Sequence, residues 1–165
     1  MKSRITALII ASLTLLTLIC ACGDKPASYK DDVALATLQA AAEAKLTGTD
    51  TFVTQDSDYV EYMMEIGKTE FVEGLVRWQA SGASADEYGI FKASDAEGAK
   101  ILGDLLRNAR KKRDEAWNPS YDADQYPKLK NAEVKVYGNY VVFCILSDAD
   151  RANVFTAIEN TLLGK

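Results

Sequence analysis

The sequence predicts an α+β domain with the element order α-α-β-β-α-β-β-α, in which a four-stranded antiparallel sheet carries helices packed on one face. Two observations predict this fold. Strand-like segments occur in two adjacent pairs, and strands joined by short turns pair in the antiparallel direction. Each pair is followed by a segment whose apolar residues recur with helical spacing, and such helices cover the sheet.

Two helices are expected before the first strand. The first covers residues 33–46, where apolar residues lie on one stripe, and Asp31 or Asp32 is placed to cap its start. The second is shorter, covers residues 58–66 and ends at Gly67.

The first hairpin is expected from strands at residues 72–80 and 88–93. Ser94 is followed three residues later by Glu97, which is the spacing of a capping box. This pair therefore predicts the start of a long helix over residues 95–117.

The remaining elements are a loop, a second hairpin and a helix. Residues 118–130 contain two prolines and predict the loop. Strands at 132–137 and 140–146 are joined by a Gly-Asn turn at 138–139, a two-residue connection whose twist suits a hairpin. Ser147 then opens the final helix.

The N-terminus has the pattern of a lipoprotein signal. Lys2 and Arg4 give a positive start, residues 5–19 form an uncharged apolar run, and the small residue Ala21 precedes Cys22. The run is short for a membrane span, which needs about 20 apolar residues. We therefore expect cleavage before Cys22, lipid attachment to this cysteine and residence on the extracytoplasmic face of the cell membrane. An ordinary signal peptide and an uncleaved anchor are the alternatives.

The expected organisation is a lipoprotein signal peptide at 1–21, a lipidated tether at 22–32 and a single domain at 33–165. The net charge of the whole chain is −5, and loss of the signal removes two of its cations. This acidity argues against nucleic acid as a partner. The expected partners are the membrane, through the lipid, and another protein or an envelope component.

The residue types present restrict the chemistry. The chain contains no histidine, which excludes Ser-His and Cys-His nucleophiles and removes the commonest metal ligand. Cys144 lies in an apolar run without basic neighbours, so we expect a buried, unreactive thiol. Stretches beginning at Asp122 and Asp148 share part of the spacing of a calcium loop, but Pro127 takes the place of the loop glycine in the first, and the second lies across a capped helix. We expect no metal site and no cofactor.

Several segments of the chain recur together in a known family. They are the lipobox with Cys22 and Gly23, the segment SADEYGIFK at 84–92, the pair Tyr126-Pro127, and GNYVVF at 138–143. On these segments the chain resembles a family of lipoproteins of Gram-positive bacteria that is described only as a domain of unknown function. The resemblance extends over essentially the whole chain after the signal. It implies an extracytoplasmic location and a single α+β domain, and it implies no activity.

An acidic pair, Asp86 and Glu87, is the first candidate site. Adjacent residues on a strand or turn point apart, so these carboxylates are not expected to share a substrate. The favoured interpretation is that Ser84 and Asp86 form side-chain-to-backbone hydrogen bonds that shape the loop. The alternative is a small envelope hydrolase or transferase that uses Asp86, Glu87 and Lys92.

A basic cluster near the end of the long helix, which includes Arg110 and Arg113, is the second candidate site. The favoured interpretation is that these cations complement the helix dipole and stay solvated. The alternative is contact with anionic lipid headgroups or cell-wall polymers. Four aromatic residues could line a groove beside this helix end, although aromatic residues in small domains more often pack in the core: Trp78, Trp117, Tyr121 and Tyr126. The candidate binding residues are Asp86, Glu87, Lys92, Arg110, Arg113, Trp117 and Tyr126.

The combination of a lipid anchor, a short tether and no catalytic constellation favours a non-enzymatic module that binds another protein or an envelope component. A carrier of small ligands is a third possibility. It needs a pocket of roughly 300 Å³ or more, and a domain of this size with one core is expected to leave little room for it.

Overall fold

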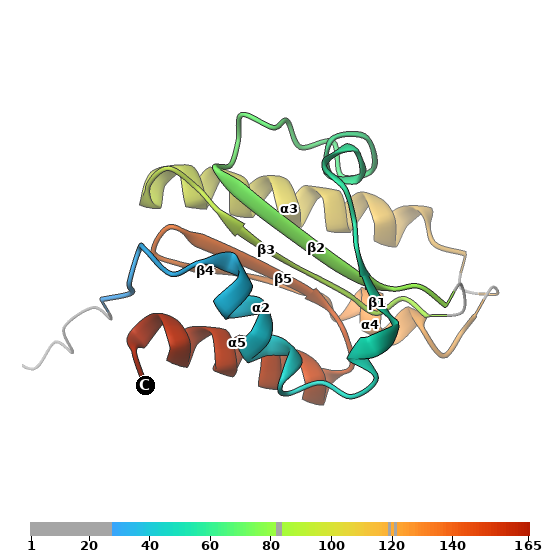
Figure 1. The fold of residues 1–165 in the computed structure, drawn as a ribbon. Coiled ribbons are helices and arrows are strands. Elements are labelled where there is room, and N and C mark those ends of the chain that lie inside the picture. Colours follow the sequence, from blue (N-terminus) through green and yellow to red (C-terminus); the bar gives the residue numbers. More distant parts are fainter. Residues whose placement is uncertain (1–27, 82–83, 119, 121) are drawn as a thin grey trace, which may run out of the picture.

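A five-stranded antiparallel sheet forms the centre of the molecule, with the strand order β1-β2-β3-β5-β4. The structure is a computed structural model that describes residues 28–81, 84–118, 120 and 122–165; the expected signal peptide and Cys22 lie outside these residues. Figure 1 shows the sheet passing between helices that lie on its two sides. The predicted α+β class and antiparallel sheet are confirmed. The strands are β1 (Phe52–Thr54), β2 (Glu73–Gln79), β3 (Glu87–Lys92), β4 (Glu133–Tyr137) and β5 (Tyr140–Ile145).

Helical segments precede, separate and follow the two hairpins. The α-helices are α2 (Leu35–Glu43), α3 (Ala96–Ala116), α4 (Tyr126–Lys130) and α5 (Asp148–Leu163). A 3-10 turn, η1 (Thr49–Thr51), leads into β1, and a π-helical turn, η2 (Tyr59–Met63), lies between β1 and β2.

The helices cover both faces of the sheet, so the prediction of helices on one face is wrong. Tyr88 and Ile90 of β3 pack in a core with α2 and α5, whereas Phe91 of the same strand packs in a second core with α3. Every residue of β5 is buried, and in β3 only Lys92 is partly exposed. Because neighbouring side chains of a strand point to opposite faces, these two central strands need a cover on each side. A sheet with one solvated face would instead alternate between apolar and polar residues.

The fifth strand is the second correction to the predicted fold. β1 has only three residues and pairs with β2 at the edge of the sheet, with Phe52 opposite Gln79. Phe52 is its one buried residue. A three-residue edge strand carries too little apolar alternation to be recognised in the sequence.

Two further segments differ from their predictions. The expected loop at 118–130 contains the short helix α4, in which Pro127 occupies the first turn, where a missing backbone N–H costs nothing. The helix expected at 58–66 is only the π-helical turn η2, because buried Val60 inside the turn and buried Ile66 after it do not form a continuous apolar stripe.

The turn and cap residues confirm the two hairpins and correct the helix starts. Gly138 adopts a positive φ of 59° in the turn between β4 and β5, and the Ser147 hydroxyl caps α5 by accepting from the Asp150 amide. The cap of α3 is Asp95, which accepts from the Gly98 amide, and the capping box at Ser94 is therefore placed one residue too early. Helix α2 begins after Ala34 with no side-chain cap, so neither Asp31 nor Asp32 has the predicted role.

Part of the expected tether is docked on the domain. The Tyr29 hydroxyl donates to Glu159, and the Tyr29 ring packs edge-on against Tyr137. The Lys30 amide donates to the carbonyl of Leu162 in α5. The chain is therefore fixed to the α2–α5 side of the sheet from Tyr29 onward.

Candidate functional site

A pocket of about 410 Å³ lies between η2 and the C-terminal half of α3, above one end of the sheet. The pocket corrects the expectation that the domain leaves no room for a small ligand. Its walls come from three places: Tyr59, Met63, Met64 and Glu65 at η2; Leu106, Ala109, Arg110, Lys112, Arg113 and Ala116 on α3; and Trp78, Glu87, Phe143 and Ile145 on the sheet. Most of the surface that these residues expose to the pocket is apolar.

The pocket forms because α3 changes from large to small side chains along the face that it turns to the sheet. Leu102 and Leu106 are completely buried there and fill the space above β5. Further along the same face, Ala109 and Ala116 line the pocket and leave that space open. Residues three and four apart share a helix face, so the sequence of α3 itself determines this change of side-chain volume.

A glycine in β3 sets the position of an aromatic ring in the pocket wall. Gly89 faces α3, and a Cβ atom placed on it would lie 2.2 Å from Cε1 of Phe143. The Phe143 ring therefore occupies the space that a side chain at Gly89 would take. Gly89 and Phe143 are paired residues on neighbouring strands β3 and β5.

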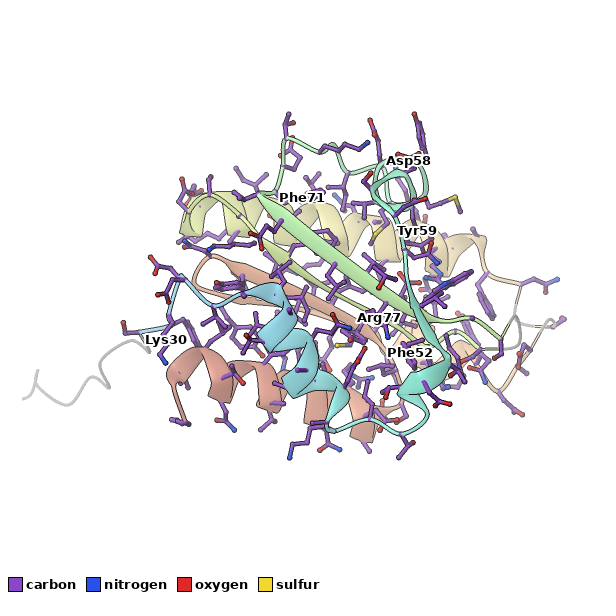
Figure 2. All side chains as sticks on the ribbon, viewed as in Figure 1. Lys30, Phe52, Asp58, Tyr59, Phe71 and Arg77 are labelled. Carbon is purple, nitrogen blue, oxygen red and sulfur yellow. The ribbon has the colours of Figure 1, made fainter. Side chains whose placement is uncertain are left out.

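Glu87 lies at the floor of the pocket and is almost completely buried, with 1% of its surface exposed. Its Oε2 atom accepts hydrogen bonds from Nη1 of Arg113 and from the Tyr59 hydroxyl, the latter at 3.0 Å. A buried carboxylate needs such partners because an unpaired charge in an apolar environment is costly. Figure 2 shows Tyr59 at the η2 turn, on the side toward the sheet. The three side chains tie η2, β3 and α3 together beneath the pocket.

Burial and this ion pair determine the protonation states of the Tyr59 and Arg113 side chains at the pocket floor. Burial raises the pKa of the Tyr59 phenol well above its usual value of 10.0, and the neighbouring Glu87 charge raises it further. Burial acts to lower the pKa of the Arg113 guanidinium, but the attraction of Glu87 outweighs this and leaves the pKa raised. At neutral pH the floor therefore holds a neutral phenol beside an ion pair without net charge.

Two further cations of α3 lie at the pocket. Lys112 forms an ion pair with Glu65 across the gap between α3 and η2, and both side chains remain largely exposed. The Arg110 side chain forms no ion pair or hydrogen bond with any other residue that the structure describes. Because two carboxylates offset two of the three cations, the pocket lining carries one net positive charge, although the whole chain carries a charge of −5.

The η2 wall has an unusual backbone. A π-helical turn is rare in proteins and recurs at functional sites. Glu65, just after this turn, adopts a positive φ of 57°, which residues with a side chain seldom do. Met63 is 72% exposed at the same turn, and Tyr62 beside it is 73% exposed. The wall thus combines an irregular backbone with apolar side chains that face solvent near the pocket.

The structure assembles only some of the candidate residues predicted from the sequence. Glu87, Arg110 and Arg113 line one pocket. Asp86 lies outside it, in an ion pair of 2.7 Å with Lys128 of α4. The predicted side-chain-to-backbone bond of Ser84 forms, since the Ser84 hydroxyl accepts from the Asp86 amide. The Asp86 carboxylate instead accepts from the Ser84 hydroxyl and pairs with Lys128.

Lys92 lies apart from the acidic pair. It stands at the opposite end of β3 from Glu87, with its ammonium 5.7 Å from the centre of the Tyr140 ring. Odd and even positions of the strand face opposite sides, so Lys92 faces the α2–α5 side. Asp86, Glu87 and Lys92 therefore do not converge, and the catalytic set of the hydrolase or transferase hypothesis is not assembled.

The predicted aromatic groove forms only in part. Trp117 packs against the core on the α3 side, and Tyr126 is the half-buried first residue of α4; neither lines the pocket. Tyr121 lies outside the described residues. Of the four predicted aromatic residues, Trp78 lines the pocket, where its ring centre is 6.3 Å from that of Tyr59.

Residues 28–81, 84–118, 120 and 122–165 contain no cluster of metal-ligating side chains and no membrane-spanning helix. In these ranges no group of three or more acidic or cysteine side chains is placed to hold a metal ion. None of the helices that the structure describes combines the length and apolar composition of a membrane span.

One family model matches the chain. The family is called Domain of unknown function (DUF4358), and the match covers residues 49–146. The chain belongs to this family. The matched segment contains the whole sheet and every residue that lines the pocket, whereas α2 and α5 lie outside it. Comparison with curated proteins and comparison with solved structures found no match.

Proposed function

We propose that this protein is a lipoprotein anchored at the extracytoplasmic face of the cell membrane, and that its domain is a non-enzymatic binding module of the cell envelope. The observation that carries the binding role is the open, mainly apolar pocket of about 410 Å³ between η2 and α3. Pockets that hold small ligands or side chains of a partner have this size and lining, with a few polar groups that fix orientation.

The pocket supports binding rather than turnover. Its buried carboxylate, Glu87, already accepts two hydrogen bonds from protein groups, so it is held as a structural ion pair. A general base must reach a proton of the substrate, whereas the Oε2 atom of Glu87 is already occupied by two protein donors. The exposed apolar side chains of Tyr62 and Met63 beside the opening add contact surface for a ligand or partner.

Photo-crosslinking in intact cells tests the binding role. A photoreactive phenylalanine analogue in place of Met63 stands at the pocket, and the same analogue in place of Asn153 stands on an exposed position of α5, across the sheet. We expect irradiation to give a discrete adduct from the Met63 position that the Asn153 position does not give. Identical adduct patterns from the two positions, or no adduct from Met63, would contradict the proposed binding site.

The anchoring role rests on Cys22, whose thiol is the group to which lipid is attached. We expect Cys22→Ser to abolish labelling by a clickable fatty acid and to leave an unprocessed precursor on a gel. Cys20→Ser is the matched control and should be labelled like the natural chain, because the residues that precede Cys20 fit a lipobox poorly. Equal labelling of the Cys22→Ser variant and the natural chain would refute the anchor.

A further inference from the structure

We infer that the pocket between η2 and α3 binds a single-chain amphiphile with a carboxylate head group, in which Arg110 holds the carboxylate and the apolar walls hold the chain. The inference names the ligand class of the proposed binding site and therefore rests on that proposal.

The charge of the lining favours a ligand with one negative charge. Arg113 is neutralised by Glu87 and Lys112 by Glu65, which leaves the charge of Arg110 without a counterpart among the described residues. Arg110 is partly buried in the pocket wall, so its guanidinium is less screened than that of a fully solvated arginine. One bound monoanion would balance the site.

The guanidinium fork and the single unpaired charge of the lining together favour a carboxylate. Its planar fork matches the two oxygens of a carboxylate in a bidentate pair. A phosphate monoester carries closer to two negative charges at neutral pH, which exceeds the single charge that the lining offers.

The apolar part of the site continues from Arg110 along the same helix face. Ala109 and Ala116 leave open space there, and Met63 and Phe143 close it from the η2 and sheet sides. A flexible alkyl chain suits such a lining, since methionine side chains adapt to irregular apolar shapes. The volume of about 410 Å³ lies within the range of pockets that bind small molecules.

The test measures binding of four probes that share an eight-carbon chain: octanoate, octanol, octyl phosphate and octyltrimethylammonium. The full-length lipidated protein is held in phosphatidylcholine nanodiscs, and equilibrium dialysis against empty nanodiscs corrects for partition into lipid. We expect octanoate to bind about tenfold more tightly than octanol, because the charge-assisted pair with Arg110 adds to the same apolar contact. Octyltrimethylammonium should bind most weakly. Tighter binding of octyl phosphate than of octanoate would overturn the carboxylate assignment.

Substitutions test separately the part of the site that holds the carboxylate and the part that holds the alkyl chain. Arg110→Gln should remove the preference for octanoate over octanol. Arg107→Gln is its matched control, one turn earlier on α3 and outside the pocket, and should keep the preference. Ala116→Phe should weaken the binding of both octanoate and octanol, because the phenyl ring fills the open space of the pocket. The same substitution at exposed Ala152 of α5 should leave the binding of both probes unchanged. A preference that survives Arg110→Gln, or that Arg107→Gln removes equally, would overturn the inference.

The experiments distinguish failure of the proposed binding role from failure of the inferred ligand class. If Met63 gives an adduct in cells but octanoate does not bind, the ligand class is wrong and the binding role stands. If octanoate binds but Met63 gives no adduct, the envelope role is wrong and the chemistry of the pocket stands.

Discussion

Replacing Glu87 by glutamine should lower the free energy of unfolding by about 2 kcal/mol. Glutamine keeps the size of the side chain and still accepts a hydrogen bond from Tyr59, but it removes the charge that faces Arg113. Loss of one partner from a fully buried ion pair costs about 3–5 kcal/mol. The Arg113 side chain is 33% exposed, so solvent screens part of its charge, and the cost should fall below that range.

A double-mutant cycle separates the ion pair from other effects of the substitutions. Arg113→Gln should also destabilise the fold, since it leaves the Glu87 carboxylate buried without its cation. The double variant should lose less unfolding free energy than the sum of the two single variants, by about 1–2 kcal/mol, because neither charge is then left unpaired. Urea unfolding followed by far-ultraviolet circular dichroism gives each value, provided that the slope of the transition is unchanged.

The neighbouring ion pair between α3 and the residue after η2 is the control. Lys112 and Glu65 are 60% and 64% exposed, so Lys112→Gln should cost less than about 1 kcal/mol. The reasoning would be refuted if Glu87→Gln cost no more than Lys112→Gln, or if the Glu87 and Arg113 substitutions were simply additive.

Two further predictions concern the walls of the pocket and the response to alkali. Gly89→Ala places a methyl group against the Phe143 ring and should destabilise the fold by about 2 kcal/mol in urea unfolding, whereas Gly67→Ala, whose nearest neighbour would be 3.7 Å away, should change stability by less than about 1 kcal/mol. Burial raises the pKa of Tyr59 and Tyr88 above the usual value of 10.0, so the folded state keeps protons that the unfolded chain releases, and stability should fall as pH rises above 10. The fall should reach about 1.4 kcal/mol per pH unit for each such tyrosine. Phenolate absorbance that appears at pH 10 for these residues while the fold is intact would contradict this assignment.

Local patterns in the sequence predicted most of the elements. The strands at β2, β3, β4 and β5 each begin and end within one residue of their predicted bounds, because alternation and turn residues act over short distances. The long helix and its approximate start were also predictable, since caps and a stripe of leucines are local signals. Four features were not predicted, namely β1, α4, η1 and the irregular form of η2, and each of these segments has three to five residues.

The packing of the elements against one another was harder to predict from the sequence. The residues at 140–146 are apolar on both faces of their strand, yet the sequence predicts the helices on one face of the sheet. The physical reason is that strand patterning shows which faces need a cover, whereas the choice of the helix that provides it depends on chain direction and loop length. The sheet order then sets α3 against one face and α2 with α5 against the other.

Some features of the candidate site likewise follow from the sequence alone, and others only from the tertiary structure. The sequence alone determined which side chains bear charge, that Arg110 and Arg113 share a helix face, and that the chain lacks histidine. Only the tertiary structure decided that Glu87 turns inward to pair with Arg113, that Lys92 faces the other side, and that Tyr59 closes the floor. A pocket is the volume that side chains from distant segments fail to fill, and no local pattern along the chain encodes a volume shared by η2, α3 and the sheet.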